Sequence, residues 1–340
     1  MANISDEIKR DKFEGGLLGL MLGDALGAPH EFRGSKDEYT GKLQYPPRIP
    51  SRYQGVRHGV VAQTSDDTEL MLALIYSMIP DSTSTKVIEY NNERAAMEYM
   101  KWANSKPMGM GFNTRALFCG VKTVNGFRNR QVKVFKKVSQ SNGSLMRCYP
   151  LALIPKENWY ADVNLSNPTK VNRDASKVFL SLVQSMWAGK GKAEALEEQI
   201  NDKTLASPIT AALFHASEID GVFPSKVDSS FPCQPYEVSG KCKGWVAVSL
   251  YTAIWGWYHS NTLEDCLDSI IERGGDTDTN AAIGGALMGS TLGKKACLKE
   301  TRVKKNWKIL RNANPEEGDF PRPNKYLCSN TREISAALGM

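Results

Sequence analysis

The stretch GGDTDTN at residues 274–280, followed by a run of small residues from Ala281 to Gly289, decides how this chain folds. Two carboxylates two residues apart cannot share one face of a helix. Asp276 and Asp278 are therefore predicted to lie in a turn that leads into a helix N-terminus. The two glycines permit a tight turn, and the small residues let neighbouring backbones approach the helix closely. We predict a helix deep inside the protein, with carboxylates at its start.

Carboxylates beside a buried helix are costly unless something positive meets them, and a cation would meet that need. A calcium loop of the EF-hand type is excluded, because its glycine position holds Ala281 and its final glutamate position holds Leu287. Taken alone, the stretch is more typical of a helix cap than of a metal site, since Asp and Thr cap helices for ordinary backbone reasons. A second acidic cluster is needed to decide between the two interpretations.

The second cluster is SDDTE at residues 65–69, directly before the apolar run Leu70 to Ile75. Ser65 is a good N-cap, and a helix dipole favours carboxylates in the first turn, so this stretch alone also indicates a cap. Together, the two clusters supply four aspartates and two hydroxyls, all of them oxygen ligands. Such a set favours Mg²⁺ or Mn²⁺ over zinc or copper, and it suffices for two ions about 3.5–4 Å apart.

A buried helix is predicted over residues 13–28, with glycine at every fourth position along one face. The glycines are Gly15, Gly19, Gly23 and Gly27. Each glycine costs a helix roughly 1 kcal/mol relative to alanine, so another helix must pack closely against this face in compensation. Asp24 is expected to accept hydrogen bonds from a neighbouring helix terminus, and Glu31 follows just past the helix end.

The chain has 340 residues, of which 41% are hydrophobic, enough for a sizeable core. Few alternating strand patterns occur, and no repeat or composition shift marks a boundary. We expect an all-α fold in one domain over residues 1–340, with irregular inserts near 33–59 and 221–244. Further helices are predicted at about 172–187, 191–200, 206–217, 244–258, 262–272 and 280–293.

Composition narrows the function classes. No apolar run approaches the roughly 20 residues of a membrane span, and the first residues lack a signal-peptide pattern, so we expect an intracellular, cytoplasmic protein. Seven cysteines without a C-x-x-C pair indicate reduced thiols, not a disulfide framework or a zinc site. The net charge is +6. The basic stretches 128–137 and 294–308 have few aromatics, which favours solvated faces over nucleic-acid binding.

Two glycine turns precede helical or turn-like stretches, at residues 108–114 and 141–147. Neither fits a Walker loop, and no predicted strand precedes them, so a dinucleotide-binding fold is not supported. Backbone amides at such turns are nevertheless a common way to hold phosphate. Two turns of this kind suit a diphosphate.

These motifs together resemble the ADP-ribosylglycohydrolases, a family that includes the dinitrogenase-reductase-activating glycohydrolases and the ADP-ribosylarginine and ADP-ribosylserine hydrolases. The similarity runs from Gly15 to about Trp307. It is carried by residues 19–32, 65–68, 244–255 and 274–279. Because several separate motifs occur in the family's order, the chain is identified as a member.

The resemblance implies an all-α hydrolase with two Mg²⁺ or Mn²⁺ ions, which acts on an ADP-ribosylated protein or peptide and releases ADP-ribose. The implied metal ligands are Ser65, Asp66, Asp67, Asp276, Asp278 and Thr279. The implied catalytic residues are Glu31, which matches the family's mobile acidic residue, with Asp67 and Asp278. The implied substrate-binding residues are Gly109, Gly111, Asn142, Gly143 and Ser144.

Two departures from the family pattern stand out. Ser65 replaces a common threonine and keeps the hydroxyl. The stretch Leu165 to Pro168 lacks a histidine that some serine-directed members carry, so their substrate preference does not transfer. Histidines elsewhere are interpreted as polar or packing residues; they are His30, His58, His215 and His259.

Two alternatives stay open: a catalytically silent member that binds ADP-ribose or serves a structural role, and a hydrolase of another ADP-ribosyl conjugate. Retention of all four aspartates favours the enzyme. The sequence does not name the linkage, whether arginine, serine or another.

Overall fold

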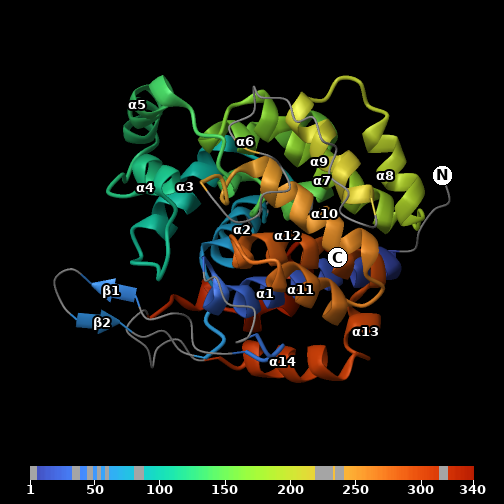
Figure 1. Ribbon diagram of the computed structural model, residues 1–340. Helices are drawn as coiled ribbons and strands as arrows, with labels where there is room; N and C mark the ends of the chain where they lie inside the picture. The colour runs from blue at the N-terminus through green and yellow to red at the C-terminus, as the bar shows by residue number, and fades with distance from the viewer. Residues whose placement is uncertain are drawn as a thin grey trace.

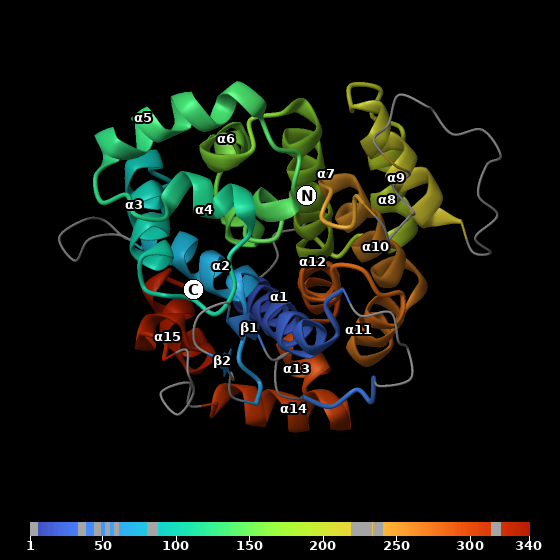
Figure 2. The same cartoon turned by 60° about the vertical axis from the view of Figure 1, so that its left-hand side comes forward.

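Helices α1 (Asp6–Gly27) and α12 (Thr277–Leu292) lie side by side through the centre of the molecule, although more than two hundred residues separate them (Figures 1 and 2). The structure is a computed structural model, and it describes residues 6–32, 39–43, 49–51, 55–57, 61–79, 88–218, 233, 241–313 and 321–340. Both helices are buried over most of their length. This pair is the centre of the core.

The predicted glycine stripe is where the two helices touch. A Cβ atom built on Gly19 would lie 1.9 Å from the carbonyl oxygen of Gly285, and one on Gly23 would lie 2.1 Å from that of Ala281. Gly15 meets the carbonyl of Gly289 in the same way. No side chain larger than hydrogen fits at such distances, so the backbones are in direct contact. The stripe thereby fixes the position of α12 relative to α1.

The remaining helices surround this pair, and α7, α10 and α11 pack against α12. The fold is all-α, as predicted. Several helices begin at a residue whose side chain accepts backbone N–H groups, as Asn91 does for α3 and Thr262 for α11. The bounds are α2 (Asp66–Met78), α3 (Asn92–Ala103), α4 (Phe112–Phe118), α5 (Val124–Val134), α6 (Trp159–Ser166), α7 (Lys170–Trp187), α8 (Lys192–Ile200), α9 (Ser207–Ser217), α10 (Val246–His259), α11 (Leu263–Glu272), α13 (Lys294–Cys297), α14 (Thr301–Arg311) and α15 (Thr331–Ala337).

The predicted irregular insert near 33–59 contains two short strands, β1 (Ile49–Ser51) and β2 (Gly55–Arg57). They pair antiparallel, with Pro50 opposite Val56. Residues 39–43 of that insert are also described, and its remaining residues lie outside the described part of the chain. So do residues 221–240 apart from Cys233. The assignment of the whole chain to one domain stays a prediction.

Two expectations about local structure need correction. The first helix begins at Asp6, seven residues before the predicted start, because charged residues extend it beyond its buried part. The structure also joins Cys233 and Cys242 in a disulfide, whereas the sequence predicted reduced thiols throughout. A spacing of nine residues carries no recognisable pattern, so the pairing was missed. Among the described residues, no helix has the length and apolar character needed to cross a membrane.

Candidate functional site

A cavity of about 670 Å³ opens where the starts of α2 and α12 come together. Further lining residues come from the segment 28–32 just after α1, from the loop before α4 and the start of α4, and from the segments 139–146 and 241–244. The two acidic stretches that the sequence placed about two hundred residues apart therefore face one space. This convergence makes the cavity the candidate site.

The start of α2 is held by Asp24 of α1. The Asp24 carboxylate accepts hydrogen bonds from the backbone N–H of Ser65, at 3.0 and 3.1 Å, and from that of Thr68, at 3.0 Å. Asp24 thus accepts from a neighbouring helix terminus, as predicted. The expected role of Ser65 was wrong in part, because its hydroxyl does not cap the helix. It donates to Asp67 Oδ2 at 3.0 Å instead.

The start of α12 follows the tight turn that the two glycines were predicted to make. Gly274 and Gly275 have φ angles of 76° and 82°, a region that disfavours other residues. The carboxylate of Asp276, the residue before α12, does not cap the helix. Asp276 Oδ2 accepts a hydrogen bond from the side-chain amide of Asn142 at 2.8 Å, so it is turned into the cavity.

The carboxylates form two groups that share Asp278. Asp24, Asp67 and Asp278 each offer an oxygen, and these oxygens lie within 4.8 Å of one another. Glu31, Asp276 and Asp278 do the same. Each group could surround one cation, and the shared Asp278 would lie between two. Asp66 belongs to neither group, although it lines the cavity, as Ser65 and Thr279 also do.

Crowding and burial make these carboxyl groups hold their protons. Burial, followed by the charges of Asp276 and Asp66, raises the pKa of Glu31 to about 8. Burial raises the pKa of Asp66 to about 6. The pKa values of Asp67 and Asp278 are raised well above the usual range by burial and then by neighbouring carboxylates. Carboxylates placed so close together cannot all ionise unless a positive charge joins them.

The donor set fits a hard divalent cation. Every candidate ligand in the two groups is an oxygen, which suits Mg²⁺ or Mn²⁺. Asp67 Oδ1 is also buried and has no hydrogen-bond partner in the part of the chain that the structure describes. A buried carboxylate oxygen is normally paired, so a cation would satisfy it.

The two predicted glycine turns lie beside the carboxylates. Gly109, Gly111, Asn142 and Gly143 line the cavity. The backbone N–H of Gly111 donates to Asp66 Oδ2 at 3.2 Å, which ties the first turn to the start of α2. Ser144 does not line the cavity. Its side chain is buried behind the second turn.

Sequence reasoning did not single out several cavity residues. Thr114 lines the cavity and is 3% exposed, yet only the glycines before it were noted. Lys243 comes from the irregular insert, and its Nζ lies 3.5 Å from the centroid of the Phe32 ring. Nothing in that insert marked a site residue. Asp24 is also among the possible ligands. From the sequence we expected it only to accept hydrogen bonds from a helix terminus, because its position relative to the acidic stretches depends on how the helices pack.

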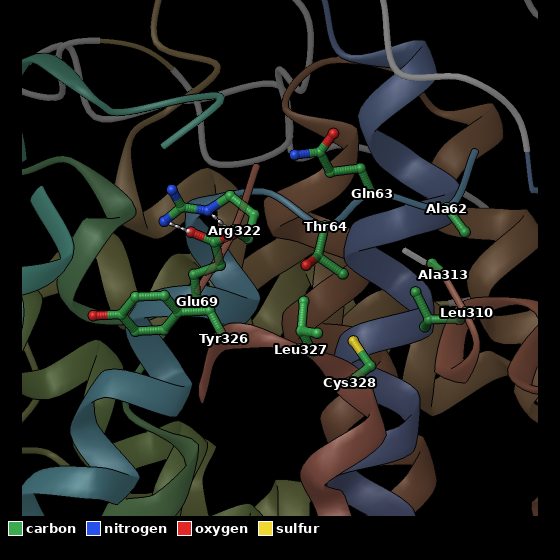
Figure 3. Close-up of a pocket in the computed structure, with 10 residues that line it drawn as sticks. All are labelled: Ala62, Gln63, Thr64, Glu69, Leu310, Ala313, Arg322, Tyr326, Leu327 and Cys328. Carbon is green, nitrogen blue, oxygen red and sulfur yellow. Dashed lines mark hydrogen bonds and ion pairs between the residues drawn. The ribbon is translucent and has the colours of Figure 1, made fainter. Parts of the chain in front are cut away.

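A second, much smaller cavity of about 20 Å³ lies on another side of α2, and Figure 3 shows its lining. There the guanidinium of Arg322 makes two hydrogen bonds of 2.7 Å to the carboxylate of Glu69 (Figure 3). Trp102 Nε1 donates to the same carboxylate at 2.6 Å. Arg322 also donates to the carbonyl and hydroxyl of Ser105, at 2.8 Å each. These bonds fix α2 from the side away from the candidate site.

Fold and site together define an all-helical protein with a carboxylate-lined cavity flanked by glycine turns. The family profile described as ADP-ribosylglycohydrolase matches residues 5–308. The chain therefore belongs to the ADP-ribosylglycohydrolase family, and membership supports an ADP-ribosyl glycohydrolase activity.

The similar proteins agree with this assignment. The chain is 26% identical over 290 residues to the ADP-ribosyl-[dinitrogen reductase] glycohydrolase of Rhodospirillum rubrum, covering 83% of this chain and 86% of that protein. It is 21% identical over 323 residues to the ADP-ribosylarginine hydrolase Tri1 of Pseudomonas putida, covering 89% and 76%. A solved structure titled ADP-ribosylglycohydrolase-related protein complex shares the fold, with a TM-score of 0.60, 18% identity and coverage of 98% and 97%.

Proposed function

We propose that this protein removes mono-ADP-ribose from modified protein side chains by hydrolysis at ribose C1″, with two Mg²⁺ or Mn²⁺ ions bound. The observation that carries the proposal is the convergence of carboxylates from three helix ends in one cavity of about 670 Å³. The names of the similar proteins in Rhodospirillum rubrum and Pseudomonas putida support the substrate class.

The chemistry of glycoside cleavage explains why such a site suits the reaction. Breaking the bond at C1″ develops positive charge on the sugar, so nearby carboxylates stabilise the transition state. The ligands of the ions would be Ser65, Asp66, Asp67, Asp276, Asp278 and Thr279, with Asp24 close by. The bound ions would supply Lewis-acid activation of a water and would orient the ribose hydroxyls.

Glu31 is the residue best placed for proton transfer. It is half-buried and lines the cavity, so it can reach both a substrate and a water molecule. Its pKa is raised to about 8, mainly by burial. A carboxyl group with a pKa near neutrality can donate a proton to the leaving group and can later accept one from water.

The glycine turns would bind the ADP part of the substrate. Gly109 and Gly143 line the cavity without side chains that would block access to their backbone amides, while the Gly111 amide donates to Asp66. A Cβ atom added at Gly109 would come within 3.7 Å of Asp66 Oδ1, so the turn lies directly against the acidic helix start. Backbone amides in this position suit a diphosphate held next to the cations.

The test is release of free ADP-ribose from ADP-ribosyl-arginine and ADP-ribosyl-serine peptides, in Mg²⁺, Mn²⁺ or EDTA. We expect metal-dependent release from at least one peptide, and the preferred peptide names the linkage. No release from either by folded, metal-loaded protein would overturn the proposal. It would point to another ADP-ribosyl conjugate or to a binding role.

A further inference from the structure

The charge of this chain is unevenly distributed along the sequence. From Tyr99 to Lys156 there are eleven lysines or arginines and no aspartate or glutamate, whereas the whole chain has 43 basic and 37 acidic residues. This segment builds α4 (Phe112–Phe118) and α5 (Val124–Val134). It also supplies both glycine turns of the cavity. Positive charge is therefore concentrated in the part of the fold that lies beside the candidate site.

Five of the basic side chains in and near this segment form what we call the basic rim. All five are exposed, and none makes an ion pair with an acidic side chain in the described ranges; they are Arg115, Lys133, Lys136, Lys137 and Lys241. Other cations of the same segment do have acidic partners: Arg128 pairs with Glu93, and Arg147 pairs with the buried Asp162. The rim charges thus have no acidic partner within the described part of the chain and are available to a binding partner.

The rim lies next to the mouth of the cavity. Lys136 and Lys137 come just before Ser139, which lines the cavity, and Lys241 lines it directly. Arg115 follows Phe112 by one helical turn, so both side chains lie on the same face of α4. Phe112 lines the cavity and is 94% exposed. The rim residues are thus connected to the cavity lining through Phe112, Ser139 and Lys241.

We propose that the basic rim docks the acidic surface that surrounds the modified residue of a protein substrate. This inference rests on the proposed function. Unpaired lysines at the edge of an interface accelerate association with an acidic partner and make it salt-dependent. Of the rim residues, only Lys241 lines the cavity that a small ADP-ribosyl conjugate would fill. The other four therefore select among macromolecular carriers of the same modification.

The apolar side chains of the rim favour a protein over a nucleic acid as the partner. Val132 is 71% exposed and Val138 is 39% exposed, and both lie among the lysines. Association with a protein buries exposed apolar side chains, whereas contacts to phosphates are made by polar and charged groups. Single-stranded nucleic acids are instead bound by successive aromatic side chains on which bases stack, and Phe112 is the one exposed large aromatic of α4 and α5.

The experiment compares two charge reversals of equal size. One variant carries Lys133→Glu, Lys136→Glu and Lys137→Glu on the rim. The control carries Lys304→Glu, Lys305→Glu and Lys308→Glu on α14. These lysines are also exposed and make no ion pair with an acidic side chain of the described residues. Figures 1 and 2 place α14 and α5 at opposite ends of the molecule. The control therefore repeats the change in net charge far from the cavity.

The substrates are two ADP-ribosylated peptides with the same modified residue, flanked by Asp and Glu in one and by Ser and Gly in the other. For the rim variant we expect kcat/KM on the acidic peptide to fall about tenfold at low salt, mainly through KM. The loss should vanish at 0.5 M salt, where the Debye length is only about 4 Å. We expect less than a twofold change on the neutral peptide, and none for the α14 variant on either peptide.

Three results would overturn the docking proposal: an equal loss from the α14 control, an equal loss on the neutral peptide, or no loss on the acidic peptide. A milder variant, with the same three rim lysines changed to Gln, should give a smaller loss on the acidic peptide alone. Circular dichroism and thermal unfolding confirm that each variant is folded.

Binding separates this proposal from the proposed function. Fluorescence anisotropy of the two peptides in EDTA measures docking without turnover. A preference of the wild type for the acidic peptide that the rim variant loses would support docking even if neither peptide is hydrolysed. Loss of binding to a labelled single-stranded DNA 20-mer, with the peptides unaffected, would assign the rim to nucleic acid and overturn the proposal.

Discussion

The starts of α2 and α12 carry equivalent acidic stretches, yet the protein holds them in place by different means. The start of α12 is fixed by direct backbone contact with α1 along a glycine stripe. The start of α2 is fixed by buried polar groups, with Asp24 on one side and the pair of Glu69 and Arg322 on the other. One motif rests on close packing, and the other on hydrogen bonds to charges.

Because the two helix starts are held by different interactions, they should respond differently to mutation, pH and salt. Backbone contact tolerates no added atom, but it does not depend on pH or salt. A buried ion pair tolerates changes of shape better, but removing one partner leaves an uncompensated charge. We therefore expect the α12 side to fail through steric overlap and the α2 side to fail through electrostatics.

The largest expected effect is on activity and should be the same at both starts. Asp67→Asn and Asp278→Asn each remove one charged oxygen from the shared carboxylate groups while keeping the side-chain shape. Loss of a metal interaction that stabilises the transition state by several kcal/mol reduces the rate by about 1000-fold. ADP-ribose release measures the rate, and calorimetric titration with Mn²⁺ measures metal affinity. Unchanged hydrolysis in either variant would contradict the metal-dependent mechanism.

Arg322→Ala should cause the largest loss of stability. Arg322 is 4% exposed, and its removal leaves the Glu69 carboxylate buried without its cationic partner. We expect the free energy of unfolding to fall by about 3–5 kcal/mol in urea titrations at pH 8. Arg128→Ala is the control, because both partners of its ion pair with Glu93 are exposed, and such pairs contribute less than about 1 kcal/mol. If both variants lose the same free energy of unfolding, the ion pair of Arg322 and Glu69 contributes no more to stability than an exposed ion pair does.

Gly19→Ala tests the packing side of the comparison. The added methyl group would overlap the carbonyl oxygen of Gly285, and relief requires α1 and α12 to move apart. Overpacking of this kind costs about 2–3 kcal/mol. Gly191→Ala is the matched control, because a Cβ there meets nothing within 4 Å and its φ is −66°. Thermal unfolding of both variants checks the prediction, and a neutral Gly19→Ala would show that the helices are not in contact as described.

The smallest expected effect is the pH dependence that Glu69 of α2 contributes to stability. Burial raises the pKa of Glu69 from 4.5 to about 7, although Arg322 and Trp102 favour its ionised form. A folded-state pKa above the unfolded value means that folding takes up a proton between pH 4.5 and 7. The free energy of unfolding from this group therefore falls as the pH rises through that window and is level above it.

Glu69→Gln should remove this slope. Urea titrations at pH 5 and pH 8 give the free energy of unfolding at each pH. The drop in this free energy from pH 5 to pH 8 should be about 1–3 kcal/mol smaller in the variant than in the wild type. Gly19→Ala should leave the slope as it is. If Glu69→Gln and wild type share one pH profile, the carboxyl group does not titrate in this window.

The packing side of the molecule could be predicted from the sequence, and the polar side could not. The glycines at every fourth position of residues 13–28 show on their own that a close partner exists, and residues 281–289 supply it. The acidic residues of the site were also found, because each stretch is local. Arg322 gives no such signal. Its partner Glu69 lies 253 positions away, and in a sequence a buried arginine cannot be told from an exposed one.

The same reason explains the residues that were missed at the site. Lys243 contacts the Phe32 ring and belongs to a stretch whose sequence shows no helical or strand period, so no periodicity could place it. The hydroxyl of Ser65 was expected to cap α2, but Asp24 takes that role from a different helix. Local sequence patterns identify candidate functional side chains, whereas the hydrogen-bond or ion-pair partner of each side chain depends on the tertiary fold.

The pairing of α1 with α12 has a consequence for how the protein is made. A ribosome releases α1 first, and its partner emerges only after residue 292 has been synthesised. Until then the apolar face of α1 cannot pack against the glycines of α12. Glu69 can pair with Arg322 only after a still later part of the chain has been synthesised. Contacts between distant parts of a chain form slowly and leave apolar surface exposed to aggregation. We expect the nascent chain to need protection by chaperones until nearly the whole polypeptide has left the ribosome.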